Sequence, residues 1–179
     1  MNDPAALDSA IRLVITLHAF LLSQSGIPVL YSGDEIGQLN DNSYHDDPLK
    51  CEDSRYLHRG NFSWEDAAKA DDQETVQGRI YQALKKLEKI RADRPVFDAD
   101  ADVWTIEPYN DHILAIGRYY ERQQLIALFN FADDEQIAWI NEQDPYRDLW
   151  TNEPCKAQGV KLAGHDFRWL LTSFEEMRK

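Results

Sequence analysis

The side chains best suited to chemistry gather in one polar stretch, residues 34–72. The stretch begins with two adjacent carboxylates, Asp34 and Glu35, a residue type that serves in acid/base catalysis. Neighbouring residues on an extended segment point to opposite sides, so these two cannot face each other across one reacting bond. A structural role, accepting hydrogen bonds from loop amides, is the simpler interpretation; direct contact with a substrate is the alternative.

Arg55 lies in the same stretch, next to Glu52 and Asp53. Its guanidinium offers several donors in a fixed fork, which suits hydroxyl groups or a carboxylate that shapes a pocket. The competing interpretation is an exposed ion pair with Asp53 or Glu52, which needs no ligand.

Metal ligation is not indicated by the spacing of potential ligands. Cys51 and Cys155 lie far apart without a CxxC or Cys/His pattern, and no acidic cluster has the alternate-oxygen spacing of a calcium loop. His18 falls on an apolar helical stretch, which favours a hydrogen-bonded core histidine. We therefore expect no metal, no cofactor and no disulfide, and a reducing compartment.

Two helices and a short apolar run surround the polar stretch. Asp3-Pro4 starts a helix that is apolar nearly all round and continues to Gly26, and a second amphipathic helix is expected from about Gln73 to Ala92. Between them, residues 27–31 (IPVLY) form a continuous apolar run bounded by glycines, which predicts a fully buried parallel strand. A strand of that kind needs neighbours on both edges.

After Pro95 the hydrophobic period changes from 3.6 to 2. Short segments rich in β-branched and aromatic residues, separated by Asn, Asp, Gly or Pro, predict an antiparallel sandwich over residues 96–179. We expect the aromatic side chains of these segments to lie in the core, namely Trp104, Tyr119, Tyr120, Phe129, Trp139, Trp150 and Trp169.

Helix, buried strand, long loop and helix are the order of consecutive units of an α/β barrel. The predicted fold class is thus an α/β fragment, the last strand and helices of a TIM-type barrel, over residues 1–95 with the long loop 34–72, followed by an all-β antiparallel sandwich over residues 96–179. One strand cannot form a parallel sheet, so the barrel is expected to be incomplete.

The run from Gly26 to Gly37 (GIPVLYSGDEIG) resembles the eighth barrel strand of the α-amylase superfamily, glycoside hydrolase family 13. Five positions match the family's GxPxxYxGxE pattern. The following Leu39-Asn40-Asp41, Asp53-Ser54-Arg55-Tyr56 and His58-Arg59 resemble amylosucrases and sucrose hydrolases, and the sandwich is similar to domain C of these enzymes. The resemblance implies a retaining enzyme that acts on sucrose or α-glucans.

In that resemblance Arg55 matches by position an arginine that contacts sugar near the active-site entrance. Asp53, Tyr44 and Asp41 share its loop and are candidates to supply acceptors and an aromatic platform for a sugar ring. Gly60 departs from the pattern, because amylosucrases continue His-Arg-Pro at this point, which leaves the local backbone less constrained.

The same resemblance places the Asp nucleophile, the Glu acid/base and the third Asp on strands upstream of this chain. No catalytic residue is therefore assigned, and the chain alone is expected to be inactive. The alternative is a non-catalytic module that binds carbohydrate or protein.

Composition limits the remaining partners. The chain has 179 residues and a net charge of −13, which repels nucleic acid and anionic membranes. Its start lacks a secretory signal and no apolar run reaches the length of a membrane span, so a cytoplasmic location is expected. Unpartnered barrel elements expose apolar surface, which predicts self-association.

Overall fold

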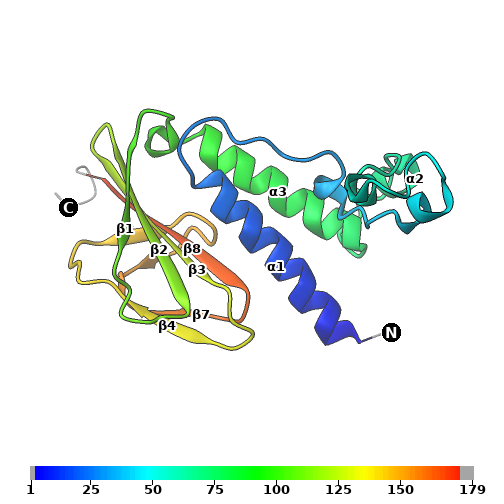
Figure 1. Ribbon diagram of the computed structural model, residues 1–179. Coiled ribbons are helices and arrows are strands. Elements are labelled where there is room, and N and C mark those ends of the chain that lie inside the picture. Colours follow the sequence, from blue (N-terminus) through cyan, green and yellow to red (C-terminus); the bar gives the residue numbers. More distant parts are fainter. Residues whose placement is uncertain (1–2, 174–179) are drawn as a thin grey trace. The chain divides into compact units, whose positions relative to one another are not determined.

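The computed structural model describes residues 3–173 and divides into two compact units (Figure 1). The first unit, called the sheet unit below, comprises the chain up to Pro28 and from Ala83 onward; the second, the loop unit, is Val29–Gln82. The helices are α1 (Pro4–Leu22), α2 (Trp64–Ala67), α3 (Val76–Ala92) and the short 3-10 turns η1 (Asp34–Ile36), η2 (Asn42–Asp46), η3 (Ser54–His58) and η4 (Pro95–Phe97). The strands are β1 (Asp102–Ile106), β2 (Ile113–Tyr120), β3 (Gln123–Asn130), β4 (Gln136–Trp139), β5 (Tyr146–Asp148), β6 (Pro154–Cys155), β7 (Gln158–Leu162) and β8 (Asp166–Ser173).

The N-terminal helix forms as its sequence predicts. Asp3 caps it by accepting hydrogen bonds from the amides of Ala5 and Ala6, and Pro4 occupies the first turn, where a missing N–H costs nothing. His18 is buried and its Nδ1 lies 2.7 Å from the Val14 carbonyl, which confirms it as a hydrogen-bonded core histidine.

By length and composition α1 meets the requirement for a membrane span, contrary to the expectation from its sequence. The core helix of a soluble protein passes the same test. Here Ala19 and Leu22 are buried in a core shared with the sheet, whereas Leu7 and Leu17 are each 46% exposed, so packing accounts for only part of the apolar character of this helix.

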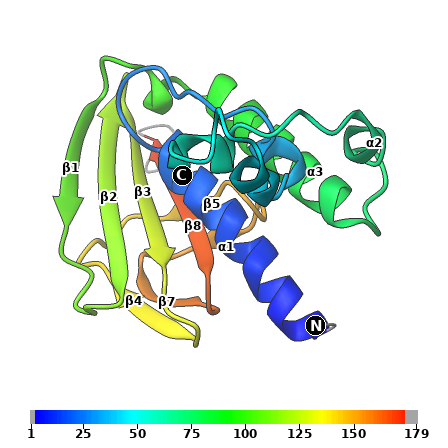
Figure 2. The same cartoon turned by 45° about the vertical axis from the view of Figure 1, so that its right-hand side comes forward.

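The antiparallel sandwich is confirmed. One sheet has the strand order β1-β2-β3-β8-β5-β6, and β4 pairs with β7 in a second, two-stranded sheet. A first core joins the large sheet to the helices through side chains such as Leu87, Phe129 and Trp169, and a second core lies on the other face with Ile126 and Leu162. Figure 2 shows α1 crossing the face formed by the strands of the large sheet. Covered on both faces, β2 and β3 are buried along most of their length. The strands β6 and β7 carry little β-branched or aromatic sequence and were not predicted.

A buried arginine fixes the C-terminal end of α1 to the sheet unit. The Arg118 guanidinium is fully buried and donates to the carbonyls of Ser23 (2.7 Å), Val96 (2.9 Å) and Asp98 (2.7 Å). Burial lowers the pKa of Arg118 to about 10. Arg91 of α3 adds bonds to the Leu22 and Gly26 carbonyls. The bonds to the Leu22 and Ser23 carbonyls satisfy acceptors that the end of α1 leaves without a helical partner.

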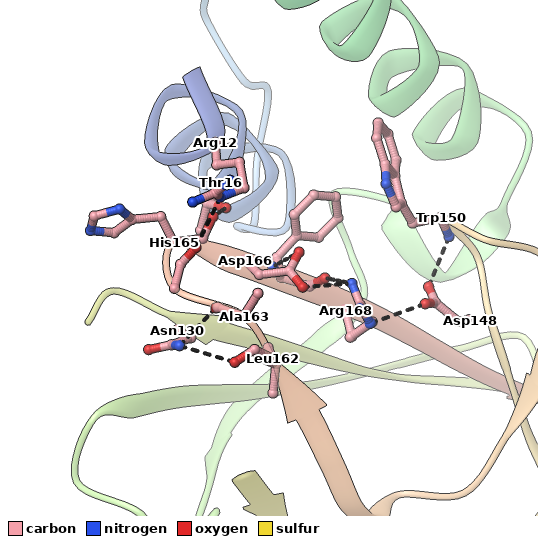
Figure 3. Close-up of polar contacts among 12 residues, drawn as sticks. Arg12, Thr16, Asn130, Asp148, Trp150, Leu162, Ala163, His165, Asp166 and Arg168 are labelled. Carbon is pink, nitrogen blue, oxygen red and sulfur yellow. Dashed lines mark hydrogen bonds and ion pairs between the residues drawn. The ribbon is translucent and has the colours of Figure 1, made fainter. Parts of the chain in front are cut away.

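The middle of α1 is fixed to the turn between β7 and β8 (Figure 3). Arg12 Nε donates to the Gly164 carbonyl at 3.2 Å, and Thr16 Oγ1 donates to the His165 carbonyl at 2.9 Å. His165 has a left-handed backbone with φ of 54°, a conformation that is uncommon for residues other than glycine. These contacts hold the strained turn in place.

The predicted buried strand at residues 27–31 is wrong. These residues form neither helix nor strand, and Ile27 and Val29 are 88% and 78% exposed. A parallel strand exists only through hydrogen bonds to neighbouring strands, and the described residues supply none at this segment.

The prediction that all seven aromatic side chains lie in the core is also wrong in part. Phe129 and Trp169 are fully buried, but Trp104, Tyr119 and Trp139 are 40%, 38% and 51% exposed. Trp104 belongs to the edge strand β1, and Trp139 lies on the outward face of β4. Period-2 alternation predicts which side chains share a face of a strand, but it does not reveal whether a second layer covers that face.

The compact units do not divide at the boundary expected near residue 95. The helix α1 and the second half of α3 share the first core with the sheet, so they group with the strands. Because α3 continues from one unit into the other, the periodicity change at Pro95 marks a change of secondary structure within the sheet unit.

Candidate functional site

All four candidate site residues lie in the loop unit, on or beside two 3-10 turns. Asp41 precedes η2 and Tyr44 lies within it, while Asp53 precedes η3 and Arg55 lies within it. The two turns contact each other, and the Asp41 amide donates to the Leu57 carbonyl at 2.8 Å. The long polar stretch is therefore folded through local caps and turns.

Asp53 and Arg55 form the closest pair of the four. Arg55 Nε donates to both carboxylate oxygens of Asp53 (2.8 and 3.1 Å), and Nη2 donates to Oδ2 at 2.7 Å. Asp53 also accepts from the Arg55 amide, which caps η3. The bonds from Arg55 lower the pKa of Asp53 to about 2, and the same contact raises the pKa of Arg55. The ion pair between Arg55 and Asp53 is therefore formed, and contact of Arg55 with a sugar stays a prediction.

The ion pair leaves part of the guanidinium available. The Arg55 side chain is 71% exposed, and no described residue accepts a hydrogen bond from its Nη1. Asp53 holds the other edge of the fork and thereby restricts its direction. An exposed, oriented donor next to a carboxylate that stays ionised above about pH 2 can bind a polar ligand.

Asp41 acts as the cap of η2. Its Oδ1 accepts from the Ser43 amide at 2.9 Å and from the Ser43 hydroxyl at 2.6 Å. The bond from the Ser43 hydroxyl, followed by that from the amide, lowers the pKa of Asp41. With Oδ1 already engaged, Asp41 orders its own loop and offers a ligand only its second oxygen.

Tyr44 does not provide the open aromatic platform that its residue type suggested. The side chain is buried, with the His45 ring at a centroid distance of 4.1 Å and a tilt of 32°. Tyr44 thus contributes apolar packing to a unit that has few buried apolar side chains. No hydrogen bond or ring contact in the described structure joins Asp41 or Tyr44 to Arg55.

Gly60, the position that departs from the resemblance, has a packing role. A Cβ atom there would lie 2.8 Å from the Cβ of Asp41, closer than side chains tolerate. Glycine at this position lets the chain following η3 approach the cap of η2. This approach could not be predicted from local sequence patterns, because it joins residues 19 positions apart.

Other hydrogen bonds across the loop were also not predicted from the sequence. The Tyr31 hydroxyl donates to the His58 carbonyl at 3.0 Å, and Gln38 bonds both the Asn61 carbonyl and the Ser63 amide. Single side chains carry these bonds, and no spacing rule identifies them. Glu35 accepts from the Gly33 amide at 2.8 Å, which confirms its predicted structural role.

The described residues contain no cluster of side chains suited to bind a metal ion. Among residues 3–173, no group of three or more His, Cys, Asp or Glu side chains is placed to hold a metal ion. The absence of a metal or cofactor remains a prediction for the whole protein.

No protein-family model matches the chain. Solved structures of amylases are similar to it. A maltogenic amylase from S. marinus superposes with a TM-score of 0.62 at 20% identity, covering 90% of this chain and 19% of its own. An Anoxybacillus α-amylase superposes with a TM-score of 0.66 at 18% identity, covering 92% of this chain and 32% of its own. A cyclic α-maltosyl-(1→6)-maltose hydrolase from Arthrobacter globiformis superposes with a TM-score of 0.60 at 20% identity, covering 91% of this chain and 30% of its own.

The chain spans between about a fifth and a third of the length of these enzymes. At such identities the likeness concerns the fold, and it extends over nine-tenths of the chain. The chain therefore shares the fold of one part of α-amylase-type enzymes, including their antiparallel C-terminal domain.

Proposed function

We propose that the chain is the C-terminal part of a retaining glycoside hydrolase or transglucosylase of the α-amylase superfamily. The observation that carries the proposal is the fold likeness over nine-tenths of the chain, together with the GxPxxYxGxE pattern at residues 26–35. In this proposal residues 1–95 are the end of an incomplete barrel, and the catalytic carboxylates come from residues that this chain does not contain.

The finer proposal is an amylosucrase-like activity on sucrose or an α-glucan. The sequence Asp53-Ser54-Arg55-Tyr56 supports it, and so does the exposed edge of the Arg55 guanidinium. A neutral sugar presents hydroxyl oxygens to an N–H donor, and the charge of −13 disfavours phosphorylated substrates. Arg55 binds sugar in this proposal, with Asp53 as its positioning partner. The proposal includes a cytoplasmic location for the enzyme.

The coding DNA immediately upstream tests the parentage. An open reading frame encoding further barrel strands with three carboxylates in order is the expected result, and the longer protein is then assayed with sucrose. In that protein Arg55→Gln should raise KM more than it lowers kcat. An upstream region without such a frame contradicts the proposal.

The second candidate is a non-catalytic module that associates with protein through exposed apolar side chains. Ile27 and Val29 favour it, because exposed apolar residues in an extended segment are a surface for self-association. Sedimentation velocity of the purified chain tests this: we expect concentration-dependent association that Val29→Ser weakens. A monomer at all concentrations contradicts it.

A further inference from the structure

Exposed aromatic and polar side chains gather on one face of the large sheet, away from the loop unit's candidate residues in the sequence. The antiparallel register pairs Asp102 of β1 with Tyr119 of β2, Tyr119 with Gln124 of β3, and Gln124 with Thr172 of β8. Paired residues in neighbouring strands point to the same face. These four therefore form a transverse polar row.

Trp104 lies beside this row as a flat platform. It pairs with Gly117, and a Cβ on that glycine would lie 2.2 Å from the Trp104 ring. The indole thus rests directly on the β2 backbone, which only glycine permits, and 40% of the side chain remains exposed. Figure 2 shows β1 at the edge of the sheet, where no further strand covers it.

The polar side chains of the row have unused bonding capacity. No hydrogen bond or ion pair within the described chain engages the side chains of Asp102, Tyr119 or Gln124, and Tyr119 is 38% exposed. At the inner end, Thr172 is buried and its Oγ1 has no partner. One step beyond the Arg147–Leu171 pair, the same register sets Tyr146 of β5 next to Thr172, and the Tyr146 hydroxyl is likewise buried without a partner. Both hydroxyls are buried, so the polar groups that a ligand on the surface can reach are those of Asp102, Tyr119 and Gln124.

The chemistry of this surface selects one class of ligand. A flat indole with a second aromatic ring nearby stacks on the C–H face of a pyranose, while carboxylate, amide and hydroxyl groups bond its hydroxyls. The carboxylate of Asp102 and the net charge of −13 repel anions. We propose that Trp104, Tyr119, Gln124 and Asp102 form a binding surface for a neutral oligosaccharide on the sheet unit.

This surface consists of residues of the chain itself, so the inference does not depend on the proposed catalytic parentage. Isothermal titration of the purified chain with maltoheptaose, cellohexaose and xylohexaose tests it. We expect binding of at least one of them. Trp104→Ala should weaken that binding by roughly tenfold or more, as truncation of a central tryptophan does at other interfaces.

Two further variants keep the result interpretable. Gln124→Ala removes a donor and acceptor without touching the packing of Trp104 on Gly117, and should weaken binding by several-fold. Trp139→Ala is the matched control, since Trp139 is also exposed (51%, against 40% for Trp104) but belongs to the outward face of β4. Thermal melting verifies that each variant folds.

The inference fails if the wild-type chain binds none of the three oligosaccharides. It fails equally if folded Gln124→Ala and Trp104→Ala bind as the wild type does, or if Trp139→Ala loses as much affinity as Trp104→Ala. Failure of the catalytic proposal leaves these binding results unchanged.

Discussion

The sheet unit and the loop unit are stabilised by different interactions. The sheet unit has an apolar core on each face of its large sheet, whereas the loop unit buries only Ile36, Tyr44 and Ile80 among its apolar side chains. Aspartate caps and side-chain bonds to the backbone hold the loop unit instead. Apolar burial supplies most folding free energy, so the sheet unit should survive conditions under which the loop unit opens.

The largest effect is expected at Arg118 in the sheet unit. Arg118→Met removes the donor to the buried Ser23 and Val96 carbonyls and one donor to the Asp98 carbonyl, which should lower the free energy of unfolding by about 3 kcal/mol. Chemical denaturation followed by tryptophan fluorescence measures it. Arg94→Met is the control, because Arg94 is exposed and its loss should cost little. Equal stability of the two variants would show that the hydrogen bonds of Arg118 at the end of α1 do not stabilise the fold.

A smaller and local effect is expected at Gly78 in the loop unit. A Cβ there would lie 1.9 Å from the Asp72 carbonyl oxygen, so Gly78→Ala forces the backbone at the start of α3 to move, at a cost of about 2 kcal/mol. Hydrogen exchange should accelerate in residues 34–82 and remain unchanged in β2 and β3.

Gly60→Ala provides the comparison within the same unit. Its Cβ would lie 2.8 Å from the Asp41 Cβ, a less severe overlap than the 1.9 Å at Gly78, and so the acceleration should be smaller. Faster exchange in β2 and β3 of Gly78→Ala would mean that the two units unfold together.

The smallest effect concerns protonation of Asp53. Hydrogen bonds from Arg55 lower the pKa of Asp53 to about 2. The ion pair therefore stabilises the folded loop unit at pH values above the ordinary carboxyl pKa, and this stabilisation is lost as the pH falls through about 2. Titration of the Asp53 carboxyl carbon by NMR should give a midpoint near this value. In Arg55→Gln the midpoint should rise toward 3.8. An unchanged midpoint would remove Arg55 as the cause.

The sequence predicted most of the sheet unit. Period-2 patterning identified β1 to β5 and β8, and the Asp3-Pro4 signal located the start of α1, because both depend on local residue order. The pattern did not distinguish an uncovered edge from a core, and Trp104 and Tyr119 were misplaced for that reason. The partner of Trp104 is Gly117, 13 positions away, and only strand register reveals it.

The loop unit was less predictable. Its candidate residues were found by resemblance, and the structure joins Asp53 to Arg55 while burying Tyr44. Residues 27–31 show the opposite limit, because their sequence predicts a strand for which residues 3–173 provide no hydrogen-bonding neighbours. Local patterns determine whether a segment is suited to a strand; pairing requires the rest of the sheet.

Sugar release by the purified chain tests the account most directly. Incubated with sucrose and with maltoheptaose, the chain should release no glucose or fructose above the level of a buffer control, because the proposed nucleophile and acid/base belong to residues outside it. Release of either sugar at a rate proportional to protein concentration, and abolished by substitution of a carboxylate within this chain, would contradict the account.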